Sequence, residues 1–435
     1  MPLADLPAYT PRMQDQETPN PFCLAVTGGG GYIGRRLCRQ ALAQGIELTV
    51  LGRKRPEGIE EGAYQFVSYD LSGAAPDLTD MDAVVHLASA GLSDGEGGEV
   101  DVTGTRALAE AAHKAGVSRF VFVSSQSSRP DAPTSYGRGK FAVETMLAEF
   151  DALIVRPGLV CGGEEGGVYG KLCEMVRTAP IVPVTCASTL LQPVHVDQLC
   201  EALLRLADPS VQPKQKMFYL GDPTPISFGR LIKDLAWTRF GRRIRLVPLP
   251  ISFVLMGIAI ARVIPGLPNI PRERVLGLTD IAIMDSPASF EALGMAPCDA
   301  ISAFAQENPK NRRRLLREGR ALLTYVTGRS VRESLIRRYV RAVEATRGSI
   351  PLNLPGIVYG WPGLMRIFEP IGGAGRVADR LAIAMVIAET TPEGAKDFCA
   401  LDQRSWLISI FELGVLLAVE AVFLPLRILL GRRNP

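Results

Sequence analysis

The stretch VTGGGGYIG, residues 26–34, decides the fold of the first half of this chain. An apolar run over residues 22–26 leads directly into four consecutive glycines, and a helical pattern follows over residues 32–44. A strand, a glycine turn and a helix in this order predict a dinucleotide site. A Cβ in the turn would collide with a pyrophosphate, and the free N–H groups at the helix start attract its charge. Four glycines would also suit a plain flexible turn, but the flanking patterns favour the nucleotide.

The composition is that of a globular protein. The length of 435 residues predicts two or three domains, and 47% of the residues are apolar against 21% charged. A net charge of +3 gives no general argument for nucleic-acid binding. Residues 1–20 are polar and proline-rich, without the apolar segment of a signal peptide, which predicts a flexible arm on a cytoplasmic protein. The eight cysteines form no C-x-x-C pair and the three histidines show no ligand spacing, so we expect reduced thiols and no metal site.

Apolar runs of strand length alternate with helical patterns in the first part of the chain. The runs cover residues 23–26, 47–51, 65–69, 83–87, 119–124 and 153–156, and the helical patterns cover residues 34–44, 102–115 and 136–150. This alternation predicts an α/β fold, a Rossmann doubly wound parallel sheet with helices on both faces. In such a sheet the cofactor lies at the carboxyl ends of the strands.

Cations follow the second predicted strand, at the position that selects the nucleotide. An NAD site usually has a carboxylate there for the ribose 2′-hydroxyl, whereas this chain has Gly52 followed by Arg53, Lys54 and Arg55. These charges would suit a 2′-phosphate, although they would also suit an ordinary solvated turn. We therefore expect NADP in preference to NAD, with Arg53 as a cofactor ligand.

Polar and small residues end the next two strands. Asp70 follows the third strand, where its carboxylate would either accept a hydrogen bond from an adenine amino group or stabilise a turn. His86 lies at the end of the fourth strand, and we expect it to be packed and hydrogen-bonded rather than catalytic. The residues after it would let the cofactor lie against the sheet edge; they are Leu87, Ala88 and Ser89.

Tyr136 and Lys140 carry the candidate chemistry. A spacing of four places both side chains on one face of a helix, where the ammonium would lower the pKa of the phenol towards working pH and also hold the nicotinamide ribose. Ser125, at the end of the fifth strand, is placed to hydrogen-bond the substrate oxygen. Y-x-x-x-K occurs by chance in many helices, but its position after a strand ending in serines, within a dinucleotide fold, favours a catalytic site.

Taken together, these motifs resemble the extended short-chain dehydrogenases/reductases, the group that includes NAD-dependent epimerases and dehydratases. The resemblance rests on TGGGGYIG, the pair Asp70-Leu71, HLAS at 86–89, FVFVSS at 120–125 and YGRGK at 136–140. RPGLVCG, PVHVD, FYLGD and ALGMAP continue it further along the chain, so that it extends over about residues 22–305.

The resemblance implies a role for each matching residue. Tyr136 would be the general acid/base, Lys140 its partner and ribose ligand, and Ser125 the residue that polarises the carbonyl. Pro157 and Gly158 would face the nicotinamide. The remaining nucleotide contacts would come from Gly28, Gly31, Tyr32, Ile33, Gly34 and Leu71.

Three features depart from the family pattern. Asp101 stands where the family usually has asparagine, and Cys161 stands where it usually has tyrosine. Only eleven positions separate Ser125 from Tyr136. This compact loop resembles the branch related to the accessory subunit of respiratory complex I, and bacterial reductases that act on lipid ketones, more than it resembles nucleotide-sugar epimerases.

The family-like part implies one unit over residues 21–305. It would contain a Rossmann core at about 21–165, later sheet strands, and a smaller substrate-binding lobe within 166–305. In the lobe, residues 251–261 form an apolar run that is too short to cross a bilayer. We expect a buried helix there, with an interfacial helix beside a hydrophobic pocket as the alternative.

Residues 306–435 form an added, mostly helical extension that the family does not require. Residues 306–347 hold twelve Lys or Arg against four Glu. The basic surface is either an ordinary solvated face or a contact for an anionic membrane or a phosphorylated ligand, whereas sparse aromatic residues argue against nucleic acid. Apolar residues at helical spacing predict two amphipathic helices. Their faces are Leu315, Leu316, Leu322, Leu323 and Val326, and Val331, Leu335, Ile336, Tyr339, Val340 and Val343.

The chain ends in an apolar segment, residues 406–430, which is interrupted by Glu412, Glu420, Pro425 and Arg427. Charged residues at these positions disfavour a helix that spans a membrane. We expect a helix packed on the protein itself, on a second copy in a homodimer, or in the membrane interface.

Three functions fit these observations. The first is an NADP-dependent oxidoreductase that acts on a carbonyl or alcohol of a hydrophobic, lipid-like substrate at a membrane surface. The second is a nucleotide-sugar or lipid-linked-sugar epimerase or dehydratase, in which the same residues oxidise the substrate transiently. The third is a non-catalytic nucleotide-binding scaffold or assembly protein, against which the complete set of Ser125, Tyr136 and Lys140 counts.

Overall fold

Two compact units make up the chain in this computed structural model, which describes residues 22–90, 97–250, 281–297, 309–346, 350–370, 375–394 and 406–431, with the single positions 252, 277 and 299. The first, the sheet unit, comprises residues 1–172, 183–229 and 246–297. The second, the helical unit, comprises residues 173–182, 230–245 and 298–435. The expected arm at 1–20 and, apart from position 252, the expected apolar helix at 251–261 lie outside the described residues.

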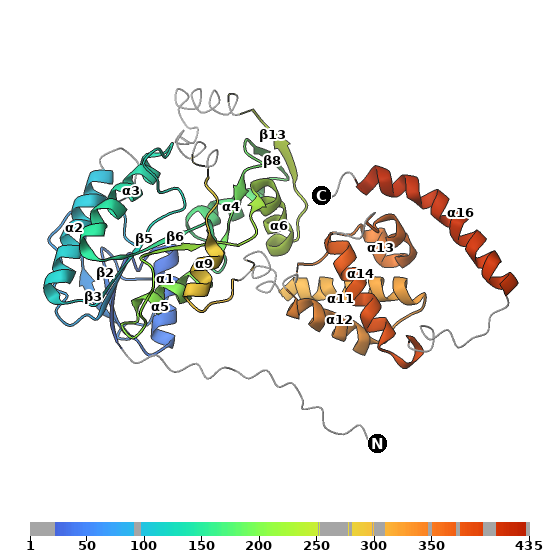
Figure 1. Ribbon diagram of the computed structural model, residues 1–435, viewed down its shortest axis with the longest axis horizontal. Helices are drawn as coiled ribbons and strands as arrows, with labels where there is room; N and C mark the ends of the chain where they lie inside the picture. Colours follow the sequence, from blue (N-terminus) through green and yellow to red (C-terminus); the bar gives the residue numbers. More distant parts are fainter. Residues whose placement is uncertain are drawn as a thin grey trace, which may run out of the picture. The chain divides into compact units, whose positions relative to one another are not determined.

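A seven-stranded parallel sheet forms the centre of the sheet unit (Figure 1). Its strands in chain order are β1 (Cys23–Thr27), β2 (Glu47–Gly52), β3 (Gln65–Ser68), β4 (Ala83–His86), β5 (Arg119–Val123), β6 (Leu153–Pro157) and β11 (Met217–Leu220). Across the sheet the order is β11-β6-β5-β4-β1-β2-β3, with every neighbouring pair parallel. The strand order reverses between β1 and β4, and such a switch point is where open parallel sheets bind ligands.

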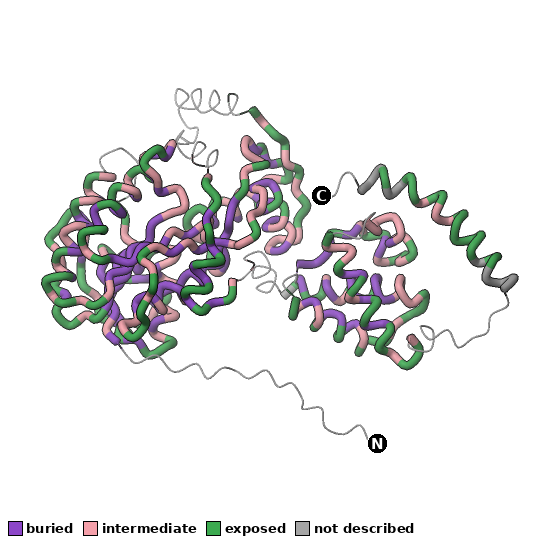
Figure 2. The backbone as a smooth tube through the Cα atoms, in the orientation of Figure 1, coloured by how far each residue is buried: buried purple, intermediate pink, exposed green. Residues whose placement is uncertain are grey.

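Alternate residues of β1 enter two different cores. Leu24 and Val26 belong to the core that includes residues of α1 (Tyr32–Ala43), α5 (Val196–Ala207) and α9 (Ser286–Ala292). Ala25 belongs to the core that includes residues of α2 (Gly97–Ala115) and α3 (Ser135–Leu147). Because successive side chains of a strand point to opposite faces, this alternation covers both faces of the sheet. Figure 2 shows the strands buried between these helices.

The predicted Rossmann class is confirmed. Each of the six strands expected from the sequence appears, as β1 to β6, with ends within one residue of the expected ones. The expected helix at 102–115 begins earlier, at Gly97, and the one at 136–150 is α3 followed by a 3-10 turn, η1 (Ala148–Phe150). Short apolar runs bounded by turn residues were sufficient to locate these buried strands.

Shorter elements follow β6. Strand β7 (Val160–Cys161) pairs with β10 (Val194–His195), and β9 (Leu190–Leu191) pairs with β12 (Ile226–Ser227). The helices α4 (Gly167–Thr178) and α6 (Phe228–Phe240) and the strands β8 (Ile181–Val184) and β13 (Arg245–Pro248) complete this part of the chain.

Packed helices form the helical unit. They are α11 (Pro309–Thr327), α12 (Glu333–Ala345), α13 (Gly356–Gly360), the 3-10 turn η2 (Pro362–Ile367) and α14 (Arg376–Glu389). The two predicted amphipathic helices are confirmed as α11 and α12. Their predicted apolar faces supply much of the core, with Leu322 and Tyr339 fully buried.

One charged residue enters this core. Glu318 is fully buried and accepts hydrogen bonds from Tyr339 Oη at 2.7 Å and from the Leu352 N–H at 2.6 Å. Its ion pair with Arg380, at 3.4 Å, offsets the charge that burial would otherwise leave uncompensated.

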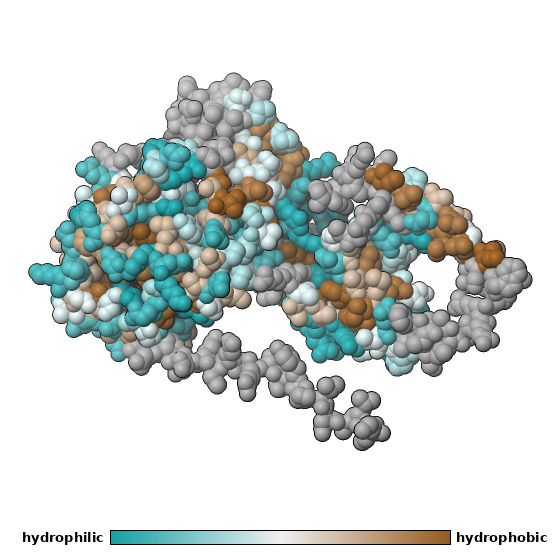
Figure 3. All heavy atoms as spheres, in the orientation of Figure 1, coloured by the Kyte–Doolittle hydropathy of each residue, from teal (hydrophilic) through white to brown (hydrophobic). Residues whose placement is uncertain are grey.

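The last described helix, α16 (Trp406–Gly431), contains Pro425 and packs along η2. Its Glu420 pairs with Arg366 of η2 at 3.2 Å. In Figure 3 apolar residues occupy much of the visible side of α16. No helix in the described part of the chain combines the length and the apolar character needed to cross a membrane.

Candidate active site

The residues expected to bind nucleotide and substrate gather at one edge of the central sheet. Because the strands are parallel, their carboxyl ends share this edge. Residues 28–34 follow β1, Arg53 follows β2, residues 70–71 follow β3, residues 87–89 follow β4, Ser125 follows β5, and residues 157–158 end β6. Tyr136 and Lys140 come from α3 instead. The fold therefore brings together the predicted site residues.

Close backbone contacts explain the glycines after β1. Gly28 has a φ of 71°, and a Cβ on it would lie 2.9 Å from the backbone nitrogen of Ala88. A Cβ on Gly34 would lie 2.2 Å from the Gly28 carbonyl oxygen. The Gly31 N–H donates to the same oxygen at 2.9 Å and closes the turn. Side chains here would push α1 away from the turn that a dinucleotide requires.

The N-terminus of α1 is open to an anion. Gly31 is the N-cap, no side chain of the described residues caps the helix, and the first turn carries no acidic residue. The first N–H groups of the helix, those of Tyr32 and Ile33, have no helical carbonyl to bind. Together with the positive end of the helix dipole, these donors fit a pyrophosphate.

The side chains of Tyr32 and Ile33 are engaged by the protein itself. Tyr32 Oη donates to the Gly162 carbonyl at 2.6 Å, and its ring stacks on Tyr169 with centroids 6.2 Å apart. Ile33 packs against the core that contains α1 and α5. If Tyr32 and Ile33 contact a nucleotide as predicted, they do so through their backbone N–H groups.

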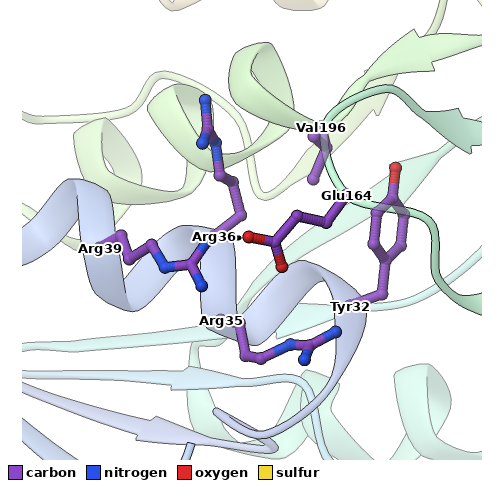
Figure 4. A pocket seen from close by; sticks show the side chains of 6 residues that line it. All are labelled: Tyr32, Arg35, Arg36, Arg39, Glu164 and Val196. Atoms are coloured by element: carbon purple, nitrogen blue, oxygen red, sulfur yellow. Dashed lines mark hydrogen bonds and ion pairs between the residues drawn. The ribbon is translucent and has the colours of Figure 1, made fainter. Parts of the chain in front are cut away.

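A small pocket beside α1 is a separate feature (Figure 4). It is lined by Tyr32, Arg35, Arg36, Arg39, Glu164 and Val196. Arg39 pairs with Glu164, and Arg36 pairs with Asp197 of α5, at 2.8 Å from Nη2. Because these two cations have carboxylate partners, the cluster joins α1 to α5 and to the segment after β7. Ser125, Tyr136 and Lys140 do not line it.

Arg53 and Asp70 face each other across the ends of β2 and β3. Arg53 Nε lies 3.6 Å from Asp70 Oδ2, and the arginine side chain is 76% exposed. Asp70 accepts hydrogen bonds from the N–H and Oγ of Ser72, which lower its pKa, and Arg53 lowers it further. Asp70 is therefore ionised at neutral pH, when both of its oxygens are acceptors for an adenine amino group. Leu71 beside it is buried.

His86 is packed and hydrogen-bonded, as predicted. It is fully buried, and its ring nitrogens lie 2.6 Å from Thr27 Oγ1 and 2.9 Å from Thr105 Oγ1. Burial, and secondarily the charge of Lys140, lowers the pKa of His86 to about 3, so the ring is neutral. Thr27 Oγ1 also accepts the N–H groups that follow His86, at 3.1 Å each, which fixes the backbone of Leu87 and Ala88.

Ser89 is tied to Asp101, the residue that departs from the family pattern. Ser89 Oγ donates to Asp101 Oδ2 at 2.7 Å, and the Ala90 N–H donates to Oδ1 at 2.6 Å. Asp101 is buried. A carboxylate thus stands at the catalytic edge where the family has a neutral amide.

Tyr136 lies close enough to Ser125 for the two hydroxyl groups to interact. Ser125 Oγ lies 3.0 Å from Ser127 Oγ and accepts the Ser127 N–H at 3.2 Å. The tyrosine is 39% exposed, but its hydroxyl lies among protein atoms, and this burial raises its pKa. The interaction with Ser125 lowers the pKa and the charge of Asp101 raises it, with a net rise. At neutral pH the phenol is therefore protonated and able to donate its proton.

Contrary to the prediction from the sequence, the Lys140 ammonium does not point towards the Tyr136 hydroxyl. Its buried ammonium donates to the Val123 carbonyl at 3.0 Å and lies 4.5 Å from the centroid of the Phe122 ring. Burial lowers the pKa of Lys140 to about 8, although Asp101 acts to raise it. The prediction that Lys140 lowers the pKa of Tyr136 is wrong for this structure, because the ammonium is directed to the backbone of β5 and the pKa of Tyr136 is raised.

The compact loop between Ser125 and Tyr136 packs directly on α3. Thr134 is the N-cap of this helix, and its Oγ1 accepts the Gly137 N–H at 3.1 Å. A Cβ on Gly137 would lie 2.4 Å from the Ser127 carbonyl oxygen and 2.6 Å from Ala132 Cβ. Gly137, inside YGRGK, is therefore needed for the close approach of loop and helix, a role that we did not predict.

Comparison with known proteins identifies the family. The chain matches the model of the NAD dependent epimerase/dehydratase family over residues 24–221. It is also 32% identical over 233 residues to the dTDP-6-deoxy-L-talose 4-dehydrogenase (NAD(P)(+)) of Kitasatospora kifunensis, a match that covers 44% of this chain and 72% of that protein. The chain belongs to the NAD-dependent epimerase/dehydratase family. Its predicted resemblance to the extended short-chain dehydrogenases/reductases is thereby confirmed.

Two other relatives of the present chain are named as reductases. It is 32% identical over 190 residues to the ceramide reductase of Caulobacter vibrioides, covering 42% of this chain and 59% of that protein. It is 26% identical over 251 residues to the 4-hydroxy-2-methyl-3-oxo-4-farnesyl-3,4-dihydroquinoline-1-oxide ketoreductase of Stigmatella aurantiaca, covering 49% of this chain and 72% of that protein. The chain thus spans less than two thirds of the ceramide reductase.

Solved structures share the fold of this family member. One is MoeE5 in complex with UDP-glucuronic acid and NAD, with a TM-score of 0.51 and 20% identity over 65% of this chain and 96% of that chain. Another is TunA, an NAD-dependent NDP-hexosamine 5,6-dehydratase, with a TM-score of 0.50 and 20% identity over 66% of this chain and 97% of that chain. At this level of identity the likeness concerns the fold.

An ion pair at the site was missed by the sequence reasoning. Glu144 of α3 is buried and pairs with Arg156 of β6, whose Nε lies 2.9 Å from Oε1. Ser124 Oγ donates to the same carboxylate. The available signal was the spacing: Glu144 lies one turn beyond Lys140 on the same helical face.

Contacts around Pro157 and Gly158 were also missed. A Cβ on Gly158 would lie 1.8 Å from the Gln192 carbonyl oxygen, and the Gly158 N–H donates to Leu220 at 2.8 Å. Gln192 is buried, and its side chain exchanges hydrogen bonds with the backbone of Met284, at 3.0 and 2.6 Å. The backbone at 157–158 is thus firmly fixed, while its contact with a nicotinamide stays a prediction.

Proposed function

We propose that this family member is an NAD(P)-dependent reductase that transfers a hydride to a carbonyl of a hydrophobic, lipid-like substrate. The observation that carries the proposal is the placement of Ser125 after β5 beside a protonated Tyr136 of α3, at the carboxyl edge of the sheet. Two hydroxyl groups side by side at this edge can bind one carbonyl oxygen and deliver a proton to it.

Each catalytic side chain has a distinct task in this proposal. Ser125 Oγ donates a hydrogen bond to the substrate oxygen and so polarises the carbonyl. Tyr136 Oη donates its proton to that oxygen as negative charge develops there. The nicotinamide, when bound, supplies the hydride. Lys140, whose ammonium donates to the Val123 carbonyl at the end of β5, is the candidate donor for the nicotinamide ribose.

The cofactor ligands follow from the sheet edge. The backbone N–H groups of Tyr32 and Ile33 would bind the pyrophosphate, Asp70 the adenine, and residues 87–89 the face of the cofactor. Gly52 in place of an acid, followed by the exposed Arg53, supports NADP as the preferred nucleotide, with NAD as the alternative.

The names of the relatives support a lipid-like substrate. One relative is named for ceramide and another for a farnesyl-bearing quinoline oxide, and both are reductases. The compact loop between Ser125 and Tyr136, packed on α3 at Gly137, agrees with this branch. The alternative is a nucleotide-sugar substrate, which the dehydrogenase named for a dTDP-sugar favours.

A nucleotide analysis and a matched variant test the proposal. Purified protein is denatured, and the released nucleotide and any extracted lipid are identified by mass spectrometry. NADPH consumption is then followed with a long-chain aliphatic ketone and, separately, with an NDP-hexose. We expect the released nucleotide to be exchangeable NADPH, and we expect NADPH to be oxidised when the long-chain ketone is added. Tyr136→Phe should lose at least about a hundredfold in kcat and keep its nucleotide affinity.

Two results would contradict the proposal. Tightly retained NAD, with turnover of the NDP-hexose alone, would assign an epimerase or dehydratase instead. A Tyr136→Phe variant with the same turnover as the wild type would remove the phenol from the reaction.

A further inference from the structure

Helix α16 leaves an unusual amount of apolar surface in contact with solvent. Phe411 is 73% exposed, Leu417 is 62% exposed and Val422 is 64% exposed. Other apolar residues of the helix that are at least two fifths exposed are Ile410, Leu413, Val415, Leu416, Leu424 and Ile428. So many exposed apolar side chains on one helix mark an interaction site rather than an ordinary solvated face.

A polar contact fixes how α16 lies on its own unit. Glu420 pairs with Arg366 of η2 at 3.2 Å, and the helix packs along η2. Leu417 and Leu424, three and four residues from Glu420 and therefore on the same helical face, are still 62% and 43% exposed, so the contact with η2 leaves apolar side chains uncovered even on that face.

Large exposed apolar side chains also occur on η2 and α13 of the same unit. Trp361, the N-cap of η2, is 70% exposed, and Ile357 of α13 is 60% exposed. Tryptophan is enriched where a protein meets the headgroup region of a bilayer, because its ring is apolar and its N–H is polar.

Arginines give the same unit a positive surface. Arg313 on α11 and Arg337, Arg338 and Arg341 on α12 are exposed, and none of these four has an ion pair within the described part of the chain. Uncompensated arginines on a protein surface attract anionic headgroups over roughly a Debye length.

We propose that the helical unit docks on the surface of an anionic lipid bilayer, with α16 lying in the interface. The acyl region of a bilayer would take up the apolar residues of α16, and its anionic headgroups would attract the unpaired arginines of the same unit. A second copy of the chain would cover the apolar residues but would bring two sets of unpaired arginines into one assembly. The charge therefore favours lipid over self-association.

Vesicle flotation of the full-length protein tests this docking without any activity measurement. The wild type is mixed with vesicles of phosphatidylcholine alone or with one third phosphatidylglycerol. We expect flotation with the anionic vesicles and at least a tenfold weaker partition for the double variant Phe411→Glu/Leu417→Glu. The triple variant Arg337→Ala/Arg338→Ala/Arg341→Ala is expected to lose most of the preference for anionic vesicles and to become insensitive to salt.

The control variant is Val168→Glu, which places the same charge at another exposed apolar residue, 60% exposed, in the sheet unit. It is expected to float like the wild type, and circular dichroism and nucleotide binding establish that every variant is folded. Equal flotation of the α16 double variant and the wild type would overturn the proposal. So would a vesicle-independent dimer, measured by sedimentation velocity, that the same α16 variant dissociates, because that result assigns the surface to a second copy.

Discussion

The carboxylate of Glu144 and the guanidinium of Arg156 form a buried ion pair that ties α3 to β6. Glu144 lies one turn after Lys140, and Arg156 lies directly before Pro157. The pair therefore holds α3, which carries Tyr136 and Lys140, against the strand whose end is expected to face the nicotinamide.

Removing one partner of this pair should be costly. Glu144→Ala leaves a largely buried arginine without its carboxylate, so we expect the free energy of unfolding to fall by about 3–5 kcal/mol. Chemical denaturation measures it. Glu149→Ala, which breaks the exposed pair with Arg106, is the control, and we expect a much smaller change from it. Equal losses for the two variants would contradict a buried role for Glu144.

The pKa of Lys140 predicts a pH-dependent stability. In the folded chain burial lowers this pKa from 10.5 to about 8, so the unfolded chain binds the proton more tightly. Unfolding then takes up a proton between these pH values, and wild-type stability should rise relative to Lys140→Met as the pH increases from 8 to 10.5. The difference should reach about 3 kcal/mol in urea denaturation. A flat difference across this range would show that Lys140 keeps its ordinary pKa.

Asp101 should set the alkaline limit of activity. Burial is the main cause of the raised pKa of Tyr136, and the charge of Asp101 raises that pKa further. Asp101→Asn removes that charge, which also raises the pKa of Lys140, so both groups should lose their protons at a lower pH and the alkaline limb of kcat/KM should move down. Ser89→Ala is the matched control, because it removes one hydrogen bond to Asp101 and keeps the charge. If the alkaline limb of kcat/KM were the same in Asp101→Asn and the wild type, an electrostatic effect of Asp101 on the site would be excluded.

The glycine turn offers two variants with opposite expectations. Gly34→Ala places a Cβ 2.2 Å from a backbone oxygen that cannot move aside, so we expect a loss of more than about 2 kcal/mol in stability. Gly30→Ala meets nothing closer than 3.9 Å, and we expect a change within about 1 kcal/mol, with a stabilising sign. Thermal unfolding compares them. If Gly34→Ala were as stable as Gly30→Ala, the turn would have to differ from the one described.

Arg53 should discriminate between the two nucleotides. Arg53→Ala is expected to weaken NADPH binding about tenfold to a hundredfold and to leave NADH binding nearly unchanged, because a charge-assisted bond to the 2′-phosphate is worth about 1.5–3 kcal/mol. Titration of nucleotide fluorescence measures both affinities. Arg55→Ala is the control, since this guanidinium lies over the Phe66 ring at 4.9 Å. An equal loss for both nucleotides would argue against a 2′-phosphate ligand.

Most of the residues at the carboxyl edge of the sheet were predictable from local sequence patterns. The glycine turn, the strand ends and the helical spacing of Tyr136 and Lys140 each depend on residues close in sequence, so the parallel sheet alone then brings them together. Interactions between distant residues were not predictable in this way. The spacing from Lys140 places Glu144 on the same helical face, but no local pattern at Glu144 or Glu318 identifies the arginine that neutralises it, Arg156 or Arg380. The direction of the Lys140 ammonium was mistaken for the same reason, because its acceptor is the Val123 carbonyl of β5.

The wholly parallel sheet has a consequence for how the chain folds. No two of its seven strands can join through a tight hairpin. One edge of β1 pairs with β4, and one edge of β6 pairs with β11. In each case the partner strand is synthesised about sixty residues later. During synthesis the apolar strands therefore stay incomplete until residue 220 has left the ribosome, whereas α11 and α12 pack on each other soon after they emerge. The nucleotide-binding half should be the slow step in reaching the native state, and the half that depends most on chaperones.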